Sequence, residues 1–224
     1  MKTQLGKLLA VLNQGLVERE EAIKVALLAA LAGEHVLLLG PPGTAKSLLA
    51  RRIARLFGDD YFEYLLTKFT TPDELFGPLS LSALKADRFE RKVQGYLPTA
   101  RIAFLDEIFK ANSSILNALL ALLNERVFHN GEKRQSAPLQ ALIAASNELP
   151  EDDEALAALY DRFLLRLHVG GVSDAALPRL FEDGDEPALA PLPLTEVDAL
   201  RERARRVTLP QEVGDALKAI WLAH

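Results

Sequence analysis

Short apolar runs alternate with amphipathic stretches along most of the 224-residue chain. Runs of this length, bounded by polar or glycine-rich segments, are typical of strands. The pattern predicts five strands, at residues 36–39, 61–66, 101–105, 139–145 and 163–169. Because helical patterns separate them, we expect a parallel sheet with helices on both faces, which makes a three-layer α/β sandwich.

Amphipathic stretches predict the helices of this sandwich. They cover residues 4–14, 18–31, about 46–56 and 112–125. The last of these has the clearest apolar face, because five of its apolar residues recur at helical spacing. These are Ile115, Leu116, Leu119, Leu120 and Leu123.

Two stretches interrupt the alternation of strands and helices. Residues 70–100 contain several prolines and glycines without a clean helical period, which is typical of an insertion with short hairpin elements. Residues 127–138 contain Asn130-Gly131, a strong signal for a two-residue hairpin turn. This hairpin would lead directly into the strand at residues 139–145.

The composition changes near residue 182. Residues 182–186 hold four acids and a glycine, and three prolines follow by residue 193, which is typical of a semi-rigid linker. Two predicted helices after the linker are too short to form a separate core. We therefore expect a core at residues 1–172, a linker at 173–194 and an incomplete helical region at 195–224.

The chemically most informative segment follows the first strand and reads GPPGTAKS from Gly40. Gly40 and Gly43 allow a loop whose backbone N–H groups point at an anion, and the next helix adds its positive N-terminus. Lys46 would reach the β- and γ-phosphates of a nucleoside triphosphate, and the Ser47 hydroxyl would bind Mg²⁺. Ala45 stands where this motif expects glycine, which the loop tolerates if that residue is helical.

Composition excludes several other functions. There are 26 basic and 31 acidic residues, so the net charge of −5 gives no global attraction to nucleic acid. The absence of cysteine excludes disulfides, thiolate catalysis and zinc–thiolate sites, and no two of the four histidines have metal-ligand spacing. No apolar run approaches the roughly 18 residues of a membrane span, and the N-terminal run is too short for a signal sequence. We therefore expect a cytoplasmic protein.

Two adjacent acids, Asp106 and Glu107, end the third predicted strand. Because ligands of a parallel sheet bind beyond the carboxyl ends of its strands, this pair would face the nucleotide. Asp106 would hold Mg²⁺ beside Ser47, and Glu107 would orient and polarise the water that attacks the γ-phosphate. Asn147 ends the fourth strand in the same way and would hydrogen-bond that water or the γ-phosphate.

An arginine precedes the fifth strand, in the segment YDRF. If exposed, Arg162 would serve as an arginine finger, supplied in trans to the nucleotide of a neighbouring subunit. The alternative is a surface ion pair with Asp161, which would contribute at most about 1 kcal/mol. The spacing alone leaves both interpretations open.

Together these motifs resemble the AAA+ ATPases, and within them the RavA-like branch of the MoxR family. The resemblance covers roughly residues 15–170. It rests on GPPGTAKS at 40–47, FTTPDELFGPLS at 69–80, GYLP at 95–98, FLDEIFKA at 104–111, LLNER at 122–126, ASNELP at 145–150 and LYDRF at 159–163. It is specific because the loops match as well as the two nucleotide motifs. In this branch Ala45 is the expected residue.

The resemblance implies a P-loop NTPase fold with the five strands in the order 5-1-4-3-2. Residues 70–100 would be a hairpin inserted in the second helix, and residues 127–138 a hairpin before the sensor strand. Both would face the centre of a hexameric ring. Residues 195–224 would begin an all-helical lid without the family's second sensor arginine, so we expect that the chain either is a fragment or lacks this contact. Weak hydrolysis and poor assembly are then predicted.

The resemblance also implies ATP and Mg²⁺ as substrate and cofactor, and it assigns roles to residues. Asn147 becomes the sensor-1 residue and Arg162 the trans finger, with Arg126 and Arg166 as alternatives. The candidate catalytic residues are Lys46, Glu107, Asn147 and Arg162. The candidate metal ligands are Ser47 and Asp106. The candidate nucleotide contacts are Gly40, Pro41, Pro42, Gly43, Thr44, Ala45, Lys46, Ser47 and Leu48.

The favoured hypothesis is a Mg²⁺-dependent ATPase that acts as a chaperone-like remodelling motor on a client protein. Relatives often work with a partner that carries a von Willebrand A domain. One alternative is a nucleotide-gated binding module with little turnover. Another is a nucleic-acid translocase, because Lys85, Arg88, Arg91 and Lys92 form a modest basic cluster. The acidic balance and the lack of an aromatic stacking pattern argue against nucleic acid.

Overall fold

The computed structural model of the chain describes residues 2–150, 153–182 and 187–223. Most of the acidic run predicted at 182–186 therefore lies outside the described residues. The chain forms two compact units, Met1–Leu192 and Pro193–His224. Among the described residues, none of the helices is long and apolar enough to cross a membrane.

The first unit is built on a five-stranded parallel sheet in the order β2-β3-β6-β1-β7. The strands are β1 (Val36–Leu39), β2 (Tyr61–Leu65), β3 (Ile102–Asp106), β6 (Ala141–Ser146) and β7 (Leu165–His168). If only these five strands are counted in chain order, β1, β2, β3, β6 and β7 become strands 1 to 5. Their order in the sheet is then 5-1-4-3-2, which confirms the prediction. The nearly continuous apolar sequences of β1, β3 and β6 form the buried centre, while β2 and β7 are the less apolar edges.

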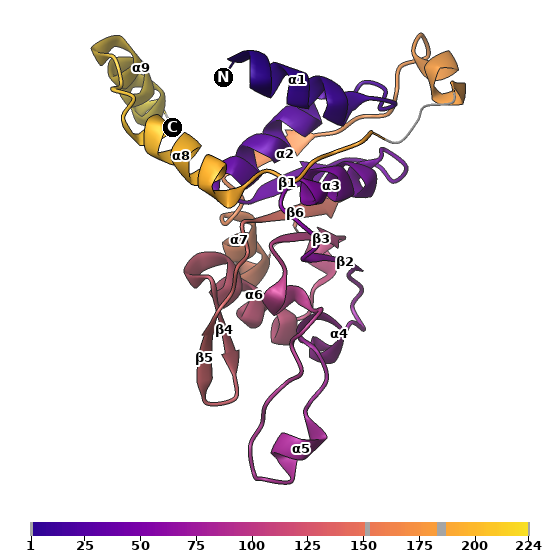
Figure 1. The fold of residues 1–224 in the computed structure, drawn as a ribbon, viewed down its shortest axis with the longest axis vertical. Coiled ribbons are helices and arrows are strands. Elements are labelled where there is room, and N and C mark those ends of the chain that lie inside the picture. Colours follow the sequence, from indigo (N-terminus) through magenta and orange to yellow (C-terminus); the bar gives the residue numbers. More distant parts are fainter. Residues whose placement is uncertain (1, 151–152, 183–186, 224) are drawn as a thin grey trace. The chain divides into compact units, whose positions relative to one another are not determined.

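Helices cover both faces of this sheet, as the sequence predicted (Figure 1). The helices α1 (Lys2–Asn13), α2 (Glu20–Ala32) and α3 (Lys46–Arg55) lie on one side, and α6 (Ser113–Glu125) and α7 (Glu154–Tyr160) on the other. Side chains of each strand point alternately to the two faces of the sheet, so each strand packs against helices on both sides. The cluster under α6 and α7 includes Leu37, Leu105, Leu142 and Ala144.

The insertion at residues 70–100 begins with α4 (Pro72–Phe76) and carries α5 (Leu81–Leu84) at its tip. It returns to the core through the short 3₁₀ helix η1 (Leu97–Thr99). Its two arms are joined by a single antiparallel bridge, between Leu79 and Arg91. Side-chain contacts therefore contribute much of what holds the arms in place.

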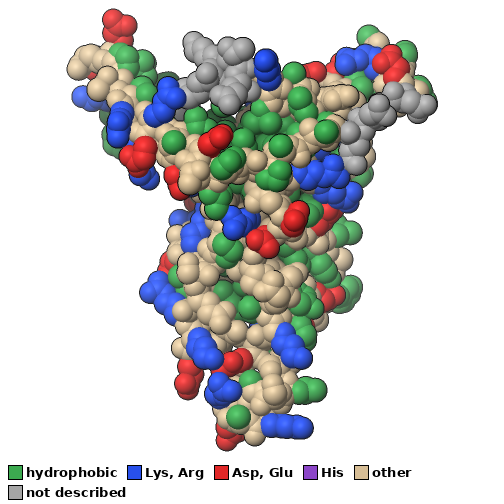
Figure 2. All heavy atoms as spheres, in the orientation of Figure 1, with side chains coloured by type: hydrophobic (Ala, Val, Ile, Leu, Met, Phe, Trp, Pro, Cys, Tyr) green, Lys and Arg blue, Asp and Glu red, His purple; other side chains and the backbone are tan. Residues whose placement is uncertain are grey.

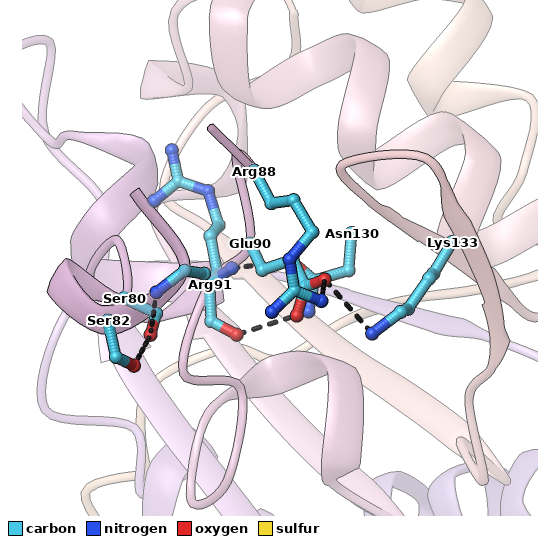
Figure 3. A network of polar contacts seen from close by, with 8 residues as sticks. Ser80, Ser82, Arg88, Glu90, Arg91, Asn130 and Lys133 are labelled. Atoms are coloured by element: carbon cyan, nitrogen blue, oxygen red, sulfur yellow. Dashed lines mark hydrogen bonds and ion pairs between the residues drawn. The ribbon is translucent and has the colours of Figure 1, made fainter. Parts of the chain in front are cut away.

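The predicted Asn-Gly hairpin is present, formed by β4 (Val127–Asn130) and β5 (Lys133–Ser136). The buried Asn130 side chain joins it to the insertion: Oδ1 accepts from the Arg91 backbone N at 2.6 Å, and Nδ2 donates to the Arg91 backbone O at 3.1 Å (Figure 3). Glu90 lies between Arg88 and Lys133 and pairs with both at 2.9 Å. The insertion and the hairpin are thus joined by one polar network.

The second unit consists of α8 (Leu194–Arg205) and α9 (Gln211–Leu222). Each helix follows a proline at its N-cap position, Pro193 and Pro210. Several large apolar residues of α9 are exposed, Trp221 at 78% among them. The assignment of this unit to the beginning of a lid stays a prediction.

Candidate active site

The three strands that carry the predicted motifs are neighbours in the sheet. β1 lies beside β6, and β6 lies beside β3, all in parallel register. Leu39 at the end of β1 pairs with Ser146 at the end of β6, and the Gly40 N–H donates to Ser146 O at 3.0 Å. The phosphate loop, the acid pair after β3 and Asn147 after β6 therefore emerge at the same carboxyl edge.

At Gly40, where the phosphate loop begins, there is no room for a side chain. This residue has φ +151°, and a Cβ built on it would lie 2.1 Å from the carbonyl oxygen of Val169. The segment that follows β7 therefore passes directly against the start of the loop. A side chain at position 40 would push these two backbone segments apart.

Ala45 is not helical, so the loop does not accommodate this alanine in the helical conformation that the sequence analysis considered. It adopts a left-handed conformation, with φ 63° and ψ 24°, and serves as the N-cap of α3. With Ala45 in this conformation, α3 starts at Lys46, directly after the loop. The alanine thus occupies a backbone geometry that suits glycine better, at a cost of about 1–2 kcal/mol.

The side chain of Lys46 is buried within the loop. Its Nζ donates to Gly40 O at 2.7 Å and to Pro41 O at 2.8 Å. Burial lowers the pKa of Lys46, and the nearby carboxylates of Asp106 and Glu107 oppose this shift. The ammonium group therefore lies in the electrostatic range of both acids, as the motif spacing predicted.

Glu107 and Asn147, predicted independently, are in direct contact. The Asn147 Nδ2 donates to Glu107 Oε1, and the Lys110 Nζ lies 3.3 Å from Glu107 Oε2. Glu107 is buried and has a positive φ of 53°, a conformation that costs a non-glycine residue free energy and is frequent at functional sites. Asp106 Oδ1 accepts from the Glu107 N–H at 3.0 Å. The carboxylate of Glu107 is thus oriented from two sides.

The possible metal ligands at this edge suit Mg²⁺, which needs few protein ligands, better than a metal ion that is bound by protein side chains alone. Among the described residues, no group of three or more histidines and acids converges. Ser47 and Asp106 offer one hydroxyl and one carboxylate at the mouth of the loop. Mg²⁺ usually takes one or two such ligands and completes its shell with waters and substrate phosphates.

The three candidate arginines lie at the opposite, amino edge of the sheet. Arg162 precedes β7, whose Leu165 pairs with Val36 at the start of β1. Arg126 and Arg162 line one cavity of about 350 Å³ together with the residues that precede β1. Because the phosphate loop follows the other end of β1, Arg162 is not brought together with the Lys46 site of its own chain.

The arginines differ in their partners. Arg126 donates to Gly33 O at 2.6 Å, and Arg166 stacks on Tyr160 with its guanidinium carbon 3.8 Å from the ring centre. Asp161 pairs with Arg166 at 3.6 Å and not with Arg162. Arg162 is exposed, and its guanidinium has no hydrogen bond or ion pair within the part of the chain that the structure describes. The alternative of an Arg162–Asp161 pair is therefore not realised.

Sequence reasoning missed one residue that contacts the phosphate loop. Arg19 is 6% exposed, and its Nε donates to Thr44 O at 2.9 Å. No motif or spacing indicates this role, because the partners of Arg19 are backbone carbonyls from distant segments. Its only sequence signal is an arginine at the start of a helix that is otherwise apolar toward the core.

Comparison with known proteins places residues 3–198 in the family described as the MoxR domain in the MoxR-vWA-beta-propeller ternary systems. An uncharacterized protein of Methanocaldococcus jannaschii is 50% identical over 94% of this chain and 56% of its own length. Chaperone MoxR1 of Mycobacterium tuberculosis is 28% identical over 69% of this chain and 41% of its own length. The chain thus spans about half the length of these relatives.

A solved structure shares the fold. The crystal structure of a Cytophaga hutchinsonii protein assigned as an ATPase superposes with a TM-score of 0.74, covering 93% of this chain and 65% of that one. The two sequences are 20% identical. At this identity the likeness supports the arrangement of helices and sheet, and the chemistry of the site rests on the residues described above.

Proposed function

The chain belongs to the MoxR family of AAA+ ATPases, and on this basis we propose that it binds ATP with Mg²⁺ and hydrolyses it to ADP and phosphate. The observation that carries the proposal is the Glu107–Asn147 contact at the same sheet edge as Lys46. A loop that only bound nucleotide would not need a buried carboxylate oriented by an amide. The family supplies the class of activity, and this contact supplies the chemistry.

The loop would bind the phosphates through its N–H groups, the N-terminus of α3 and the ammonium of Lys46. The carbonyls of Gly40 and Pro41 now hold that ammonium, so phosphate oxygens would replace them as its partners. Ser47 and Asp106 would hold Mg²⁺. When bound, Mg²⁺ would neutralise charge on the phosphates.

Glu107 would orient the attacking water and accept its proton. With Oε1 held by Asn147 and Oε2 near Lys110, the carboxylate keeps one direction and still has lone pairs for the water. A positioned base of this kind contributes about 10²–10⁴-fold to a rate. Asn147 would act both as the partner of Glu107 and as the sensor-1 residue.

Arg162 would complete the site of a neighbouring subunit. Its position at the amino edge suits a contact with another copy of the chain, as does a guanidinium that pairs with no residue among those the structure describes. Arg126 and Arg166 are less available because each already binds backbone carbonyls of its own chain. This proposal implies a ring in which each nucleotide lies between two subunits, for which the family resemblance favours six.

The client surface is proposed at the tip of the insertion. Residues 79–92 and 127–136 together contain six basic and three acidic side chains, although the whole chain carries a net charge of −5. Figure 2 shows basic and hydrophobic side chains together at the end that carries α5. Leu81 is 72% exposed and Phe89 68%. Such a surface suits an acidic, partly apolar protein segment.

The family description names von Willebrand A and β-propeller components of the same systems. We propose that a von Willebrand A-domain protein presents the client to this chain. The remodelling role agrees with the name of the Mycobacterium tuberculosis relative, a chaperone. The RavA-like branch stays a prediction, because the matching family model does not specify it.

The substitution Glu107→Gln tests the ATPase proposal. The amide retains an acceptor for Asn147 but cannot take a proton, so turnover should fall at least about 100-fold while ATP affinity changes little. The matched control is Glu125→Gln, which neutralises an exposed carboxylate paired with Arg134. Steady-state phosphate release and calorimetric ATP titration measure the two quantities. Equal turnover in wild type and Glu107→Gln would rule out this mechanism.

The nucleic-acid alternative is tested at two lysines rather than at Arg91. Arg91 is tied to Asp73 and to Gly77 O, so neutralising it would disrupt the insertion itself. The side chains of Lys85 and Lys92 are exposed and have no hydrogen bond or ion pair among the described residues. Salt-dependent DNA binding that is lost in Lys85→Gln/Lys92→Gln would support a translocase over a protein remodeller.

A further inference from the structure

Arg19 joins three separate segments of the chain behind the phosphate loop. Its Nε donates to Thr44 O at 2.9 Å, its Nη2 to Gly170 O at 2.9 Å and its Nη1 to Glu18 O at 2.5 Å. These acceptors belong to the phosphate loop, the segment after β7 and Glu18, the neighbour of Arg19 in the chain. Arg19 is 6% exposed, so these carbonyls rather than solvent hold its guanidinium.

The contact with Thr44 bears on anion binding. A loop that turns successive N–H groups toward a phosphate turns carbonyl groups away from it, and these carbonyls need partners of their own. Arg19 supplies that partner for Thr44, while the Thr44 hydroxyl donates to Pro41 O at 3.0 Å. The charge of Arg19 also reaches the site, because it contributes to the lowered pKa of Lys46.

A second contact fixes the same junction. Both oxygens of the Glu18 carboxylate accept from Ser173, one from its backbone N at 2.7 Å and one from its hydroxyl at 2.6 Å. The Val169 N–H donates to Leu39 O at 2.6 Å just before the phosphate loop. The loop is therefore held on its rear side by residues 18–19 and 169–173.

We propose that Arg19 is a positioning residue for the nucleotide, which holds the phosphate loop in its anion-binding conformation through the Thr44 carbonyl. This inference rests on the proposed function, since it deepens the account of the same site. Lysine cannot replace it, because a single ammonium cannot span three carbonyls in a fixed fork. Loss of Arg19 would free the loop to turn carbonyl groups toward the phosphates.

The chain offers a matched control in Arg52. This arginine is 5% exposed, and its Nη1 donates to the carbonyls of Leu12 and Gln14, which lie outside the phosphate loop. Arg19→Met and Arg52→Met therefore each remove a buried guanidinium bound to backbone carbonyls. Both variants are expected to lose stability, and only one of them touches the loop.

The experiment is calorimetric titration of the full chain with ADP and Mg²⁺, well below the unfolding temperature of each variant. Arg19→Met and Arg19→Lys should weaken ADP binding at least about tenfold, while Arg52→Met stays within about threefold of wild type. In steady-state turnover, Arg19→Lys should raise KM for ATP more than it lowers kcat.

Three outcomes would count against the inference. Equal loss of ADP affinity in the Arg19 and Arg52 variants would overturn it, because stability alone would then explain both. The same holds if Arg19→Lys binds ADP like wild type. Failure of the wild-type chain to bind ADP would instead overturn the proposed function together with this inference.

Discussion

His35 makes the first unit sensitive to mild acid. This residue is 3% exposed, and its Nδ1 accepts a hydrogen bond from the Leu142 N–H at 2.9 Å. Its Nε2 lies 3.3 Å from Leu123 O and 2.7 Å from Arg126 Nη1. Protonation at Nδ1 would remove the bond from Leu142 and place a second cation beside Arg126. Burial, and after it the charge of Arg126, lower the pKa of His35 to about 3.

The sign follows from proton linkage. Between pH 6.5 and about 3, the unfolded chain binds a proton at His35 that the folded chain does not, so stability falls as the pH falls. At pH 5 the difference amounts to about 2 kcal/mol relative to pH 7.5. The hydrogen bond from Arg51 lowers the pKa of Glu63, so its contribution to stability is lost only as the pH falls below the ordinary glutamate value of about 4.5.

The perturbation is His35→Asn, whose side-chain oxygen can accept from Leu142 but does not titrate. Urea unfolding followed by circular dichroism at pH 7.5 and 5.0 gives the free energy of unfolding of each variant. Wild type should lose about 2 kcal/mol more between the two pH values than His35→Asn. The control is His129→Gln, at an exposed position, which should keep the wild-type loss. If His35→Asn lost as much unfolding free energy as wild type between pH 7.5 and 5.0, His35 would not be the group that makes the unit sensitive to acid.

Three further substitutions test single contacts. Gly40→Ala should lower ADP affinity at least about tenfold in calorimetry, because its Cβ would meet the Val169 carbonyl; unchanged affinity would contradict the close approach. Asn130→Ala should cost about 2 kcal/mol in urea unfolding and speed amide exchange around Arg91, and unaltered exchange would mean that the side chain does not hold the insertion. Ala45→Gly should leave ADP affinity unchanged and add up to about 1 kcal/mol of stability, whereas a loss of stability would contradict the left-handed conformation.

The sequence predicted the sheet because each strand is an apolar run with a distinct end. Strand order followed from the family resemblance, and the meeting of Lys46, Glu107 and Asn147 followed from where parallel strands end. These features depend on local pattern and on general rules of α/β folds. The convergence of these residues at one edge of the sheet was therefore largely predictable, whereas the direct contact between Glu107 and Asn147 was not.

What the sequence did not predict depends on distant backbone contacts. Arg19 acts through the carbonyls of Thr44 and Gly170, and Asn130 acts through the backbone of Arg91. Carbonyl groups are the same at every position, so no residue pattern marks them as partners. The left-handed conformation of Ala45 was not predicted for a related reason: the geometry of the loop overrides the preference of alanine.

The trans arrangement is tested most directly by mixing two inactive variants. Arg162→Ala keeps the phosphate loop but lacks the finger, and Lys46→Ala lacks the loop lysine but keeps the finger. In a randomly mixed ring, about a quarter of the interfaces would combine an intact Lys46 with an intact Arg162. ATP turnover should therefore be near zero for each variant alone and recover substantially in the mixture. A mixture as inactive as its components would contradict a site completed by Arg162 of a neighbouring subunit.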